Sequence, residues 1–321
     1  MKISTMTFDK IIEVAQNDQS LKLNHTCLRV KDPKVSVQFY EEKFGMKLLN
    51  RKDFPDMKFS LYFLTFSGNK DVPKDVNGNL NPFAIQGTLE LTHNWGTESD
   101  PDYKINNGNV EPHRGYGHVG FATNDIVAEC EKLESLGVEF KKRLSDGRQK
   151  DIAFVLDPDG YWIELVQYKK ETKQTGYKFN HTMIRIKDPE KSVKFYENVL
   201  GMHTLMKRDY PEAKFTNYFM GYYKDVEDRL AIEGVLELTH NWGTESDADF
   251  HYHNGNDKPQ GFGHICITMN DPATLCKTIE ETYGDAIPWA PKWNQGKMKG
   301  LAFLKDPDGY SIEVVPDNFT L

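Results

Sequence analysis

Apolar and polar positions alternate in a short run at 25–30 (HTCLRV), a pattern that is typical of a half-buried β-strand. Asp32 and Pro33 follow, as expected for a helix N-cap with proline at the first helical position, and Gly45 is placed to end that helix. The same order recurs in the second half of the chain, from 181–186 through Asp188-Pro189 to Gly201. The pattern therefore predicts one strand and one helix at each of these two places.

A second kind of unit begins with the run 117–123 (GHVGFAT), which also alternates like a strand. Asp125 is the expected helix cap, and Gly137 follows the helix. The predicted buried stripe of that helix consists of Val127, Cys130, Leu133 and Leu136. The second half repeats this unit with Asp271-Pro272 as the cap and Gly284 as the end, and DPDG turns at 157–160 and 306–309 precede the last strand of each half. We expect an α+β fold of four βαβββ modules.

A twelve-residue segment, LELTHNWGTESD, occurs without change at Leu89–Asp100 and Leu236–Asp247. Asn24–Met46 and Asn180–Met202 also match, and the matching segments follow one another in the same order in both halves. A repeat of this length indicates two tandem domains. The expected organisation is an N-terminal extension at 1–20, a first domain at 21–168, a linker at 169–176 and a second domain at 177–321.

The two halves differ mainly in their connecting segments. The stretch 67–87 is longer than its counterpart 221–234. The Asn- and Gly-rich stretches 101–113 and 248–259 are expected to be mobile flaps, since such segments usually lie on the surface.

Composition and charge exclude several classes of protein. The 321 residues suffice for two domains, each with its own core. A net charge of -8 and the lack of a basic run argue against a nucleic-acid partner. No apolar stretch approaches the ~18 residues that cross a bilayer, and the N-terminus lacks the apolar run of a signal peptide. We therefore expect a protein that does not enter a membrane. Because the four cysteines form no CxxC pair, we also expect a reduced, cytoplasmic protein.

Each predicted module contains one His and one Glu at matching strand positions. These residues are His25, Glu90, His118 and Glu164 in the first half, and His181, Glu237, His264 and Glu313 in the second. One His or Glu in a strand is more often a core or solvated residue than a ligand. Recurrence of all four in both halves favours metal binding, because a carboxylate among apolar neighbours is costly unless it is paired or bound to a cation. Two imidazoles and two carboxylates suit Zn²⁺, Ni²⁺ or Co²⁺.

Other candidate residues carry less weight. His93 and His240 have the opposite strand parity from the nearby glutamates, so they should point to the other face. Four further histidines have no counterpart in the other half: His113, His203, His251 and His253. No phosphate loop, dinucleotide fingerprint or Cys/His nucleophile pattern occurs, and the cysteines are interpreted as structural.

The segments LRVKDP, LELTHNWGTE, GFGHI, GKMKGLAF and DPDGYWIE together resemble the glyoxalase I (lactoylglutathione lyase) family, in its fused two-domain form known from yeasts. The resemblance extends over nearly the whole chain, from about Asn24 to Pro316. It implies paired modules of the vicinal oxygen chelate fold, with each site in a curved sheet made by modules from different halves. It also implies that the hemithioacetal of methylglyoxal and glutathione is isomerised to S-lactoylglutathione, a reaction that detoxifies methylglyoxal.

The resemblance implies how the eight candidate ligands pair. One site would contain His25, Glu90, His264 and Glu313, and the other His118, Glu164, His181 and Glu237. Zinc is the expected metal, one ion per site, with Ni²⁺ or Co²⁺ as alternatives. Glu164 and Glu313 would be the catalytic bases, and Glu90 and Glu237 would be the ligands opposite them.

Eight further residues match substrate positions of the family: Arg29, Asn94, Arg114, Lys142, Arg185, Asn241, Lys292 and Met298. Arginine suits the carboxylates of glutathione, because its planar group pairs with both oxygens. Gln260 replaces Arg114 in the second half, and GRQKD at 147–151 stands where the second half has GKMKG at 296–300. We therefore expect two active sites with different affinities. A monomer suffices, since the fused halves supply all four modules.

Two alternatives to this function stay open. An Fe(II) dioxygenase of the same superfamily would prefer two histidines and one carboxylate, which four protein ligands per site argue against. A binding protein with the same fold but without metal would have no reason to keep all eight ligands.

Overall fold

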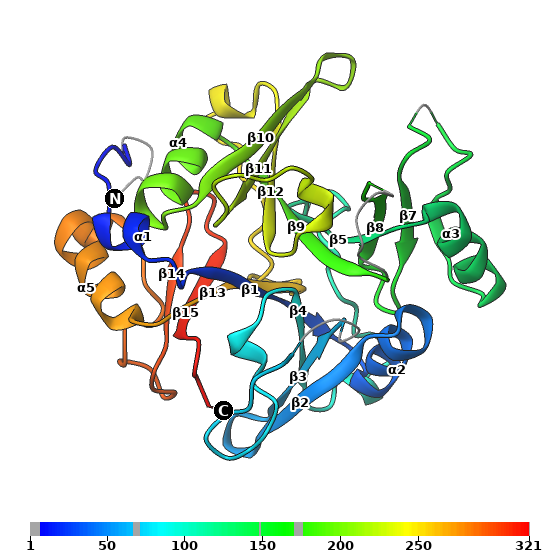
Figure 1. Cartoon of the computed structure of the whole chain (residues 1–321), viewed down its shortest axis with the longest axis horizontal. Coiled ribbons are helices and arrows are strands. Elements are labelled where there is room, and N and C mark those ends of the chain that lie inside the picture. Colours follow the sequence, from blue (N-terminus) through cyan, green and yellow to red (C-terminus); the bar gives the residue numbers. More distant parts are fainter. Residues whose placement is uncertain (1–6, 67–70, 148, 170–175, 321) are drawn as a thin grey trace.

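The structure is a computed structural model that describes residues 7–66, 71–147, 149–169 and 176–320. Its strands form two mixed sheets that lie side by side, with helices packed against their outer faces (Figure 1). The predicted α+β fold of paired βαβββ modules is confirmed.

The first half begins with a short helix and contains two modules. The helix is α1 (Glu13–Asn17). The first module contains β1 (Lys22–Val30), α2 (Pro33–Phe44), β2 (Lys47–Phe54), β3 (Phe59–Thr65) and β4 (Thr88–Asn94). The second module contains β5 (Tyr116–Thr123), α3 (Ile126–Ser135), β6 (Phe140–Lys142), β7 (Ala153–Leu156) and β8 (Trp162–Gln167).

The second half repeats this order. Its first module contains β9 (Lys178–Ile186), α4 (Pro189–Lys194), β10 (His203–Tyr210), β11 (Phe215–Gly221) and β12 (Val235–Asn241). Its second contains β13 (Phe262–Met269), α5 (Pro272–Tyr283), β14 (Ala302–Lys305) and β15 (Ser311–Pro316). In this last module, a single bridge between Trp289 and Leu304 takes the place that β6 has in the second module of the first half. Helix α4 continues as a π-helical turn, Phe195–Val199, before Gly201 ends the segment.

Each sheet combines modules from opposite halves. The seven-stranded sheet has the order β14-β15-β13-β1-β4-β3-β2, and the eight-stranded sheet has the order β10-β11-β12-β9-β5-β8-β7-β6. The halves meet where β1 pairs antiparallel with β13, and again where β5 pairs antiparallel with β9. Neither sheet can therefore form from one half of the chain alone.

The helix caps act as the sequence predicts. The side chain of Asp32 accepts a hydrogen bond from the backbone of Lys34, and Gly45 ends α2 with a φ of 72°, a left-handed conformation that favours glycine. The predicted stripe of α3 is partly wrong, since the exposed fractions of Val127 and Leu136 are 54% and 40%. The buried stripe consists of Ile126, Cys130 and Leu133. In the first turn of the helix, Ile126 is therefore buried in place of Val127.

The N-terminal segment before β1 packs against the second half. The backbone N–H of Ile12 donates to the carbonyl of Asn198 at 2.7 Å, and the Asn198 side chain donates to the carbonyl of Phe8 at 2.6 Å. The ring of Phe8 meets that of Phe195 edge-on. Helix α1 accordingly lies beside α5 rather than beside the modules that follow it in sequence (Figure 1).

Hydrogen bonds argue against the expectation that 101–113 and 248–259 are mobile flaps. The amide of Asn109 donates to the carbonyl of Gly117, and the amide of Asn256 donates to that of Gly263. The two stretches also form bridges with strand ends of the opposite half, as at Asn106 and Gly261. These stretches serve as ties between the halves.

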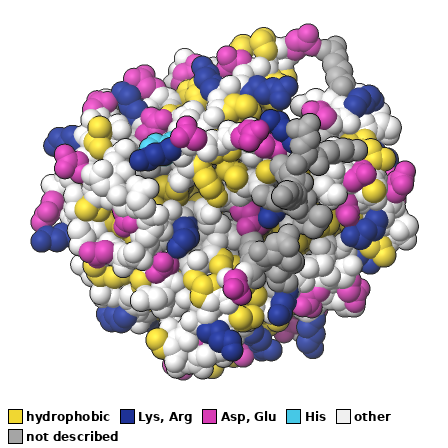
Figure 2. Space-filling view, viewed as in Figure 1, with side chains coloured by type: hydrophobic (Ala, Val, Ile, Leu, Met, Phe, Trp, Pro, Cys, Tyr) yellow, Lys and Arg dark blue, Asp and Glu magenta, His cyan; other side chains and the backbone are white. Residues whose placement is uncertain are grey.

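None of the helices in the described ranges is long and apolar enough to cross a membrane. Acidic and basic side chains are interspersed over the face shown in Figure 2, without a continuous basic patch.

The DPDG turns tie the second module of each half to a helix that covers the other sheet. Oδ1 of Asp157 accepts hydrogen bonds from the backbone of Asp159 and Tyr161, and Oδ2 accepts one from the hydroxyl of Tyr40 on α2 at 2.9 Å. Tyr196 and Asp306 form the equivalent contact at 2.9 Å. Tyr40 and Asp157 are buried, so each of these contacts joins the two sheets where water cannot substitute for a lost partner.

We predict that Tyr40→Phe lowers the free energy of unfolding by about 1–3 kcal/mol, the cost of leaving a buried carboxylate oxygen without its donor. Urea denaturation followed by circular dichroism measures the change. Tyr210→Phe is the matched control, because the Tyr210 ring stacks on Phe215 at a half-buried position and should lose no more than about 0.5 kcal/mol. Equal losses in both variants would contradict this role for the Tyr40 hydroxyl.

Candidate metal centres

Four neighbouring strands of the seven-stranded sheet each contribute one ligand to the first site. His25 lies on β1, Glu90 on β4, His264 on β13 and Glu313 on β15. In the register, Cys27 is opposite both His264 and Glu90. Because side chains alternate along a strand, this register places the four ligands on one face of the sheet.

The side-chain atoms of the first site converge on one point. Nε2 of His25 lies 3.2 Å from Nε2 of His264, 3.1 Å from Oε2 of Glu90 and 3.5 Å from Oε2 of Glu313. His264 Nε2 lies 3.7 Å and 3.6 Å from the same two carboxylate oxygens. Both glutamates contact both histidines, so the four ligands form one group.

The second site repeats this arrangement on β5, β8, β9 and β12 of the other sheet. His118 Nε2 and His181 Nε2 are 3.2 Å apart. Oε2 of Glu164 lies 3.1 Å from His181 and 3.7 Å from His118, and Oε2 of Glu237 lies 3.3 Å and 3.9 Å from them. The structure thus brings the eight predicted ligands together in the two predicted sets.

The donor set fits a divalent transition-metal ion. Ligand atoms about 2.1 Å from a tetrahedral ion lie about 3.4 Å from one another, and the separations in both groups are close to that spacing. All four glutamates are largely buried, where two ionised carboxylates beside each other need a compensating cation. The residues present therefore fit such an ion.

An asparagine orients the first histidine of each site, which the sequence analysis missed. Oδ1 of Asn24 lies 2.6 Å from Nδ1 of His25, and Oδ1 of Asn180 lies 2.8 Å from Nδ1 of His181. The carbonyl oxygen fixes the proton on Nδ1 and leaves Nε2 free to bind a metal. The repeated Asn-His dipeptide was the available signal.

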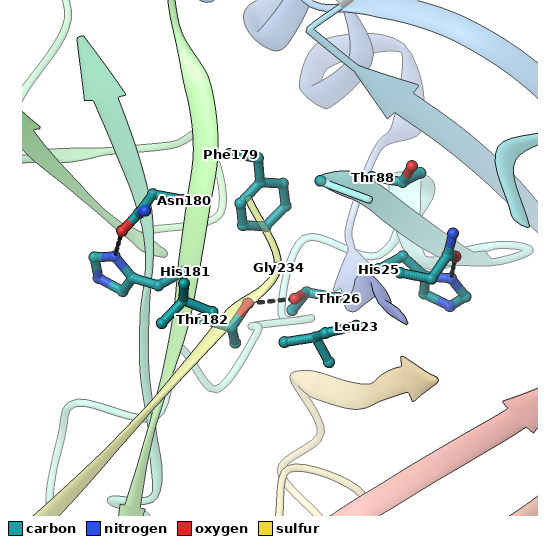
Figure 3. A pocket seen from close by; sticks show the side chains of 12 residues that line it. Leu23, His25, Thr26, Thr88, Phe179, Asn180, His181, Thr182 and Gly234 are labelled. Atoms are coloured by element: carbon teal, nitrogen blue, oxygen red, sulfur yellow. Dashed lines mark hydrogen bonds between the residues drawn. The ribbon is translucent and has the colours of Figure 1, made fainter. Parts of the chain in front are cut away.

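The two sites lie on opposite sides of a contact between β1 and β9. The hydroxyls of Thr26 and Thr182 hydrogen-bond to each other at this contact. Figure 3 shows His25 and His181 on either side of it, with the imidazole of His181 held by Asn180. The parity of the strands explains the arrangement, since the threonines point between the sheets and the histidines point into the sites.

The local environment shifts the pKa values of the ligands differently in the two sites. Burial opposes ionisation of Glu90, but the hydrogen bond from His25 and the charge of His264 hold its pKa at about 2. In the second site, burial raises the pKa of Glu237 to about 7 and lowers those of His118 and His181 to about 3 and about 4. The second pair of imidazoles is thus neutral, which is the form that coordinates a metal.

Glu90 and Glu237 are each anchored by a further donor. The hydroxyl of Thr92 donates to Oε1 of Glu90 at 2.9 Å. In the second site the amide of Asn217 donates to Oε1 of Glu237, and Thr239 in turn donates to Asn217. Each carboxylate therefore keeps one oxygen in place for the cation while the other is held by the protein.

Comparison with known proteins agrees with this geometry. Residues 22–165 and 178–314 match the model of the Glyoxalase/Bleomycin resistance protein/Dioxygenase superfamily. Glyoxalase I of Saccharomyces cerevisiae is 64% identical over 311 residues, which cover 95% of each chain. The chain belongs to the glyoxalase I family. The crystal structure of glyoxalase I from Zea mays matches with a TM-score of 0.73 and 30% identity, covering 95% of each chain.

A shorter bacterial member of the family aligns with one half of the chain. The lactoylglutathione lyase of Pseudomonas aeruginosa is 52% identical over 150 residues, which cover 46% of this chain and 84% of the bacterial one. The tandem duplication therefore corresponds to two copies of a unit that also occurs singly.

A pocket of about 490 Å³ opens beside the first glyoxalase I site. Three residues matched to substrate positions line it: Arg29, Asn94 and Met298. The guanidinium of Arg29 also donates to the carbonyls of Gly261 and Phe262 and to the side chain of Asn256, which orients it. Cys27, interpreted from the sequence as structural, also lines the pocket.

The remaining substrate candidates have other partners as well. Arg185 is buried and donates to the carbonyls of Gly108, Gly115 and Tyr116. The amide of Asn241 donates to the Tyr252 hydroxyl, and Arg114 pairs with Glu111 at 3.3 Å.

The two lysines matched to substrate positions are engaged elsewhere. Lys142 donates to the carbonyls of Gln149 and Ile152. Lys292 pairs with Glu280 of α5 at 2.9 Å, and Lys297 rather than Lys292 lines the pocket.

His93 and His240 lie on the opposite face from the ligands, as their parity predicts. Nε2 of each donates a hydrogen bond of 2.7 Å to a glutamate carboxylate of the following turn: His93 to Glu98, and His240 to Glu245. The identical motif thus serves two purposes, since its glutamate enters the site and its histidine fixes the turn.

We predict that Gly120→Ala removes metal from the second site alone. Its Cβ would lie 2.0 Å from Cε1 of His181, so the imidazole must leave its position. Elemental analysis of the purified protein should find about one ion per chain in place of about two.

Cys266→Ala is the matched control for that variant. Cys266 lies two residues after His264, as Gly120 lies two residues after His118, and it already has a Cβ. The control should retain both ions. Full metal content in Gly120→Ala would contradict the assignment of His181 as a ligand.

Proposed function

We propose that the chain is a lactoylglutathione lyase that isomerises the hemithioacetal of methylglyoxal and glutathione at two metal sites. The observation that carries this proposal is the pair of His₂Glu₂ groups in a glyoxalase I chain, each assembled by strands from both halves. We further propose that one chain acts as a monomer in the cytoplasm, because it contributes every ligand of both sites itself.

Zinc is the proposed ion in each site, held by His25, Glu90, His264 and Glu313 in the first and by His118, Glu164, His181 and Glu237 in the second. Two imidazole nitrogens and two carboxylate oxygens suit Zn²⁺, Ni²⁺ and Co²⁺ alike. When bound, such an ion supplies positive charge beside the two oxygens of the hemithioacetal, which stabilises the negative charge that develops on them.

Glu313 and Glu164 are the proposed bases. Each takes the proton from C1 of the hemithioacetal and returns it to C2, so the reaction needs no redox partner. Their side chains have exposed fractions of 9% and 12%, against 4% and 6% for Glu90 and Glu237. The less exposed pair is anchored by Thr92 and Asn217, which suits a ligand that stays in place. The more accessible pair is better placed to reach the substrate.

The glutathione part of the substrate carries two carboxylates, for which cations are required. Arg29 and Asn94 line the first pocket, and Arg185 and Asn241 occupy the equivalent strand positions in the second site. We propose that each pair orients glutathione so that C1 faces the base. Arg114 and Lys142 add positive charge near the second site only, and Met298 adds an apolar surface to the first only.

We predict that Glu164→Gln and Glu313→Gln each retain part of the activity, because each removes one of two bases, and that the double variant loses it. The ultraviolet absorbance of the thioester product, followed with methylglyoxal and glutathione, measures the rate. Glu131→Gln, at an exposed position of α3, is the control and should leave the rate unchanged. Loss of all activity in either single variant would contradict two independent sites.

Metal removal gives a second prediction. Dialysis against a chelator should abolish thioester formation, and added Zn²⁺ should restore it, with about two ions bound per chain at full activity. The same assay under anaerobic conditions should give an unchanged rate, whereas a dioxygenase would stop. Activity that survives complete removal of metal would overturn the proposal.

A further inference from the structure

The two metal groups have similar ligand separations, 3.1–3.7 Å in the first and 3.1–3.9 Å in the second, but the residues beside them differ in polarity. The first site adjoins a buried apolar cluster that includes Leu61, Phe63, Phe83 and Leu301. Phe63 and Phe83 contact the ring of His25 directly, at centroid distances of 5.7 Å and 5.9 Å. In the second site, Asn217 occupies the strand position of Leu61, because each pairs with the threonine that follows the ligand glutamate by two residues.

Arg229 replaces a proline at the edge of this cluster. Asn24 donates a hydrogen bond to the carbonyl of Pro82, and Asn180 donates the equivalent bond to the carbonyl of Arg229. Since the two asparagines occupy matching positions, Pro82 and Arg229 do as well. The second site thus has a guanidinium group where the first has only an apolar ring.

The guanidinium of Arg229 lies beside a strand residue that is the direct neighbour of a ligand. Its central carbon lies 3.6 Å from the ring centre of Phe219, which pairs with Glu237 in the sheet register. Burial lowers the pKa of Arg229, while the charges of Glu237 and Glu164 oppose that shift. The cation is therefore held within electrostatic reach of both ligand carboxylates.

One donor of this guanidinium is unused. Nη1 of Arg229 is buried and has no hydrogen-bond partner among the residues that the structure describes. A buried donor without an acceptor is costly, and proteins rarely keep one unless a ligand or water supplies the acceptor. Nη1 is thus available to a polar atom of a molecule bound in the second site.

The two arginines of the second site lie at opposite ends of the metal group. Arg185 follows His181 by four residues on β9, whereas the backbone of Arg229 is bonded to Asn180, the residue before His181. If glutathione extends toward Arg185, the substituent of the 2-oxoaldehyde extends the other way, toward Arg229. In the first site the same end is lined by the apolar rings of Phe63 and Phe83.

We propose that the two sites divide 2-oxoaldehydes by the polarity of their substituent. The first site takes hemithioacetals with apolar substituents, such as a phenyl group. The second takes those with a hydroxyl or carboxylate substituent, and Arg229 is the residue that selects them by donating from Nη1. This inference rests on the proposed lyase function, which supplies the substrate class.

Enzymes with one working site test the division. Glu313→Gln leaves the second site active, and Glu164→Gln leaves the first. Each is assayed for thioester formation with glutathione and either phenylglyoxal or hydroxymethylglyoxal. The ratio of kcat/KM for hydroxymethylglyoxal to that for phenylglyoxal should be at least about tenfold higher in Glu313→Gln, the effect of one hydrogen bond from a charged donor.

Reciprocal substitutions then assign the effect to one position. Arg229→Met in the Glu313→Gln enzyme should lower the ratio by about tenfold, and Pro82→Arg in the Glu164→Gln enzyme should raise it. Arg208→Met is the matched control, because Arg208 is an exposed cation over the Tyr210 ring and should leave the ratio unchanged.

Binding of unreactive thioethers provides a readout that does not depend on turnover. In calorimetric titrations, Arg229→Met in an otherwise unaltered chain should weaken one S-(carboxymethyl)glutathione site about tenfold and leave S-benzylglutathione binding intact. Equal substrate ratios in the two single-site enzymes would overturn the division, and a ratio insensitive to both Arg229→Met and Pro82→Arg would overturn the role of Arg229. Absence of thioester formation from every aldehyde would instead refute the lyase function.

Discussion

The antiparallel pairing of strands between the two halves determines the rest of the structure. Where β1 pairs with β13, His25 comes within 3.2 Å of His264, and where β5 pairs with β9, His118 comes equally close to His181. The two glutamates of each site arrive on the strands that flank these central pairs. Because backbone hydrogen bonds set the register, a slip of one residue would turn the ligands to the wrong face.

The contacts outside the sheets reinforce this pairing. Arg29 and Arg185 each bond to backbone carbonyls of the opposite half, and the DPDG turns bond to helices that cover the other sheet. Arginines that hold the halves together also lie at the substrate sites. Their positions would change if the pairing between the halves changed, so fold stability and substrate orientation depend on the same guanidinium groups.

The fold and the eight ligands could be predicted from the sequence because the duplication shows each candidate position twice. A glutamate at one position of one strand is weak evidence, but Glu90 and Glu237 in identical twelve-residue segments are strong evidence. Strand alternation correctly placed His93 and His240 on the outer face. The pairing of modules across the halves was implied by the family resemblance and not by spacing. In the first site, for example, His25 and His264 are 239 positions apart in the sequence.

What the sequence did not reveal depends on contacts that leave no local signal. Arg229 aligns with Pro82 in the repeat, and because the two residues differ, the repeat could not indicate that a guanidinium lies near Glu237. Its place results from the hydrogen bond between its carbonyl and Asn180. The stripe of α3 was misjudged because a ten-residue helix tolerates exposed Val127 at its start.

The sharing of each sheet between halves has a consequence for how the sites can change over time. A chain of half this length would need a second copy of itself to complete a site, and the rotational symmetry of such a pair would make both sites identical. Every substitution would then alter both. In the present chain each position of the site is encoded twice. Pro82 can therefore change without Arg229, and Leu61 without Asn217. The two sites of this chain can therefore differ from each other while the pairing of strands between the halves keeps the ligand geometry of both.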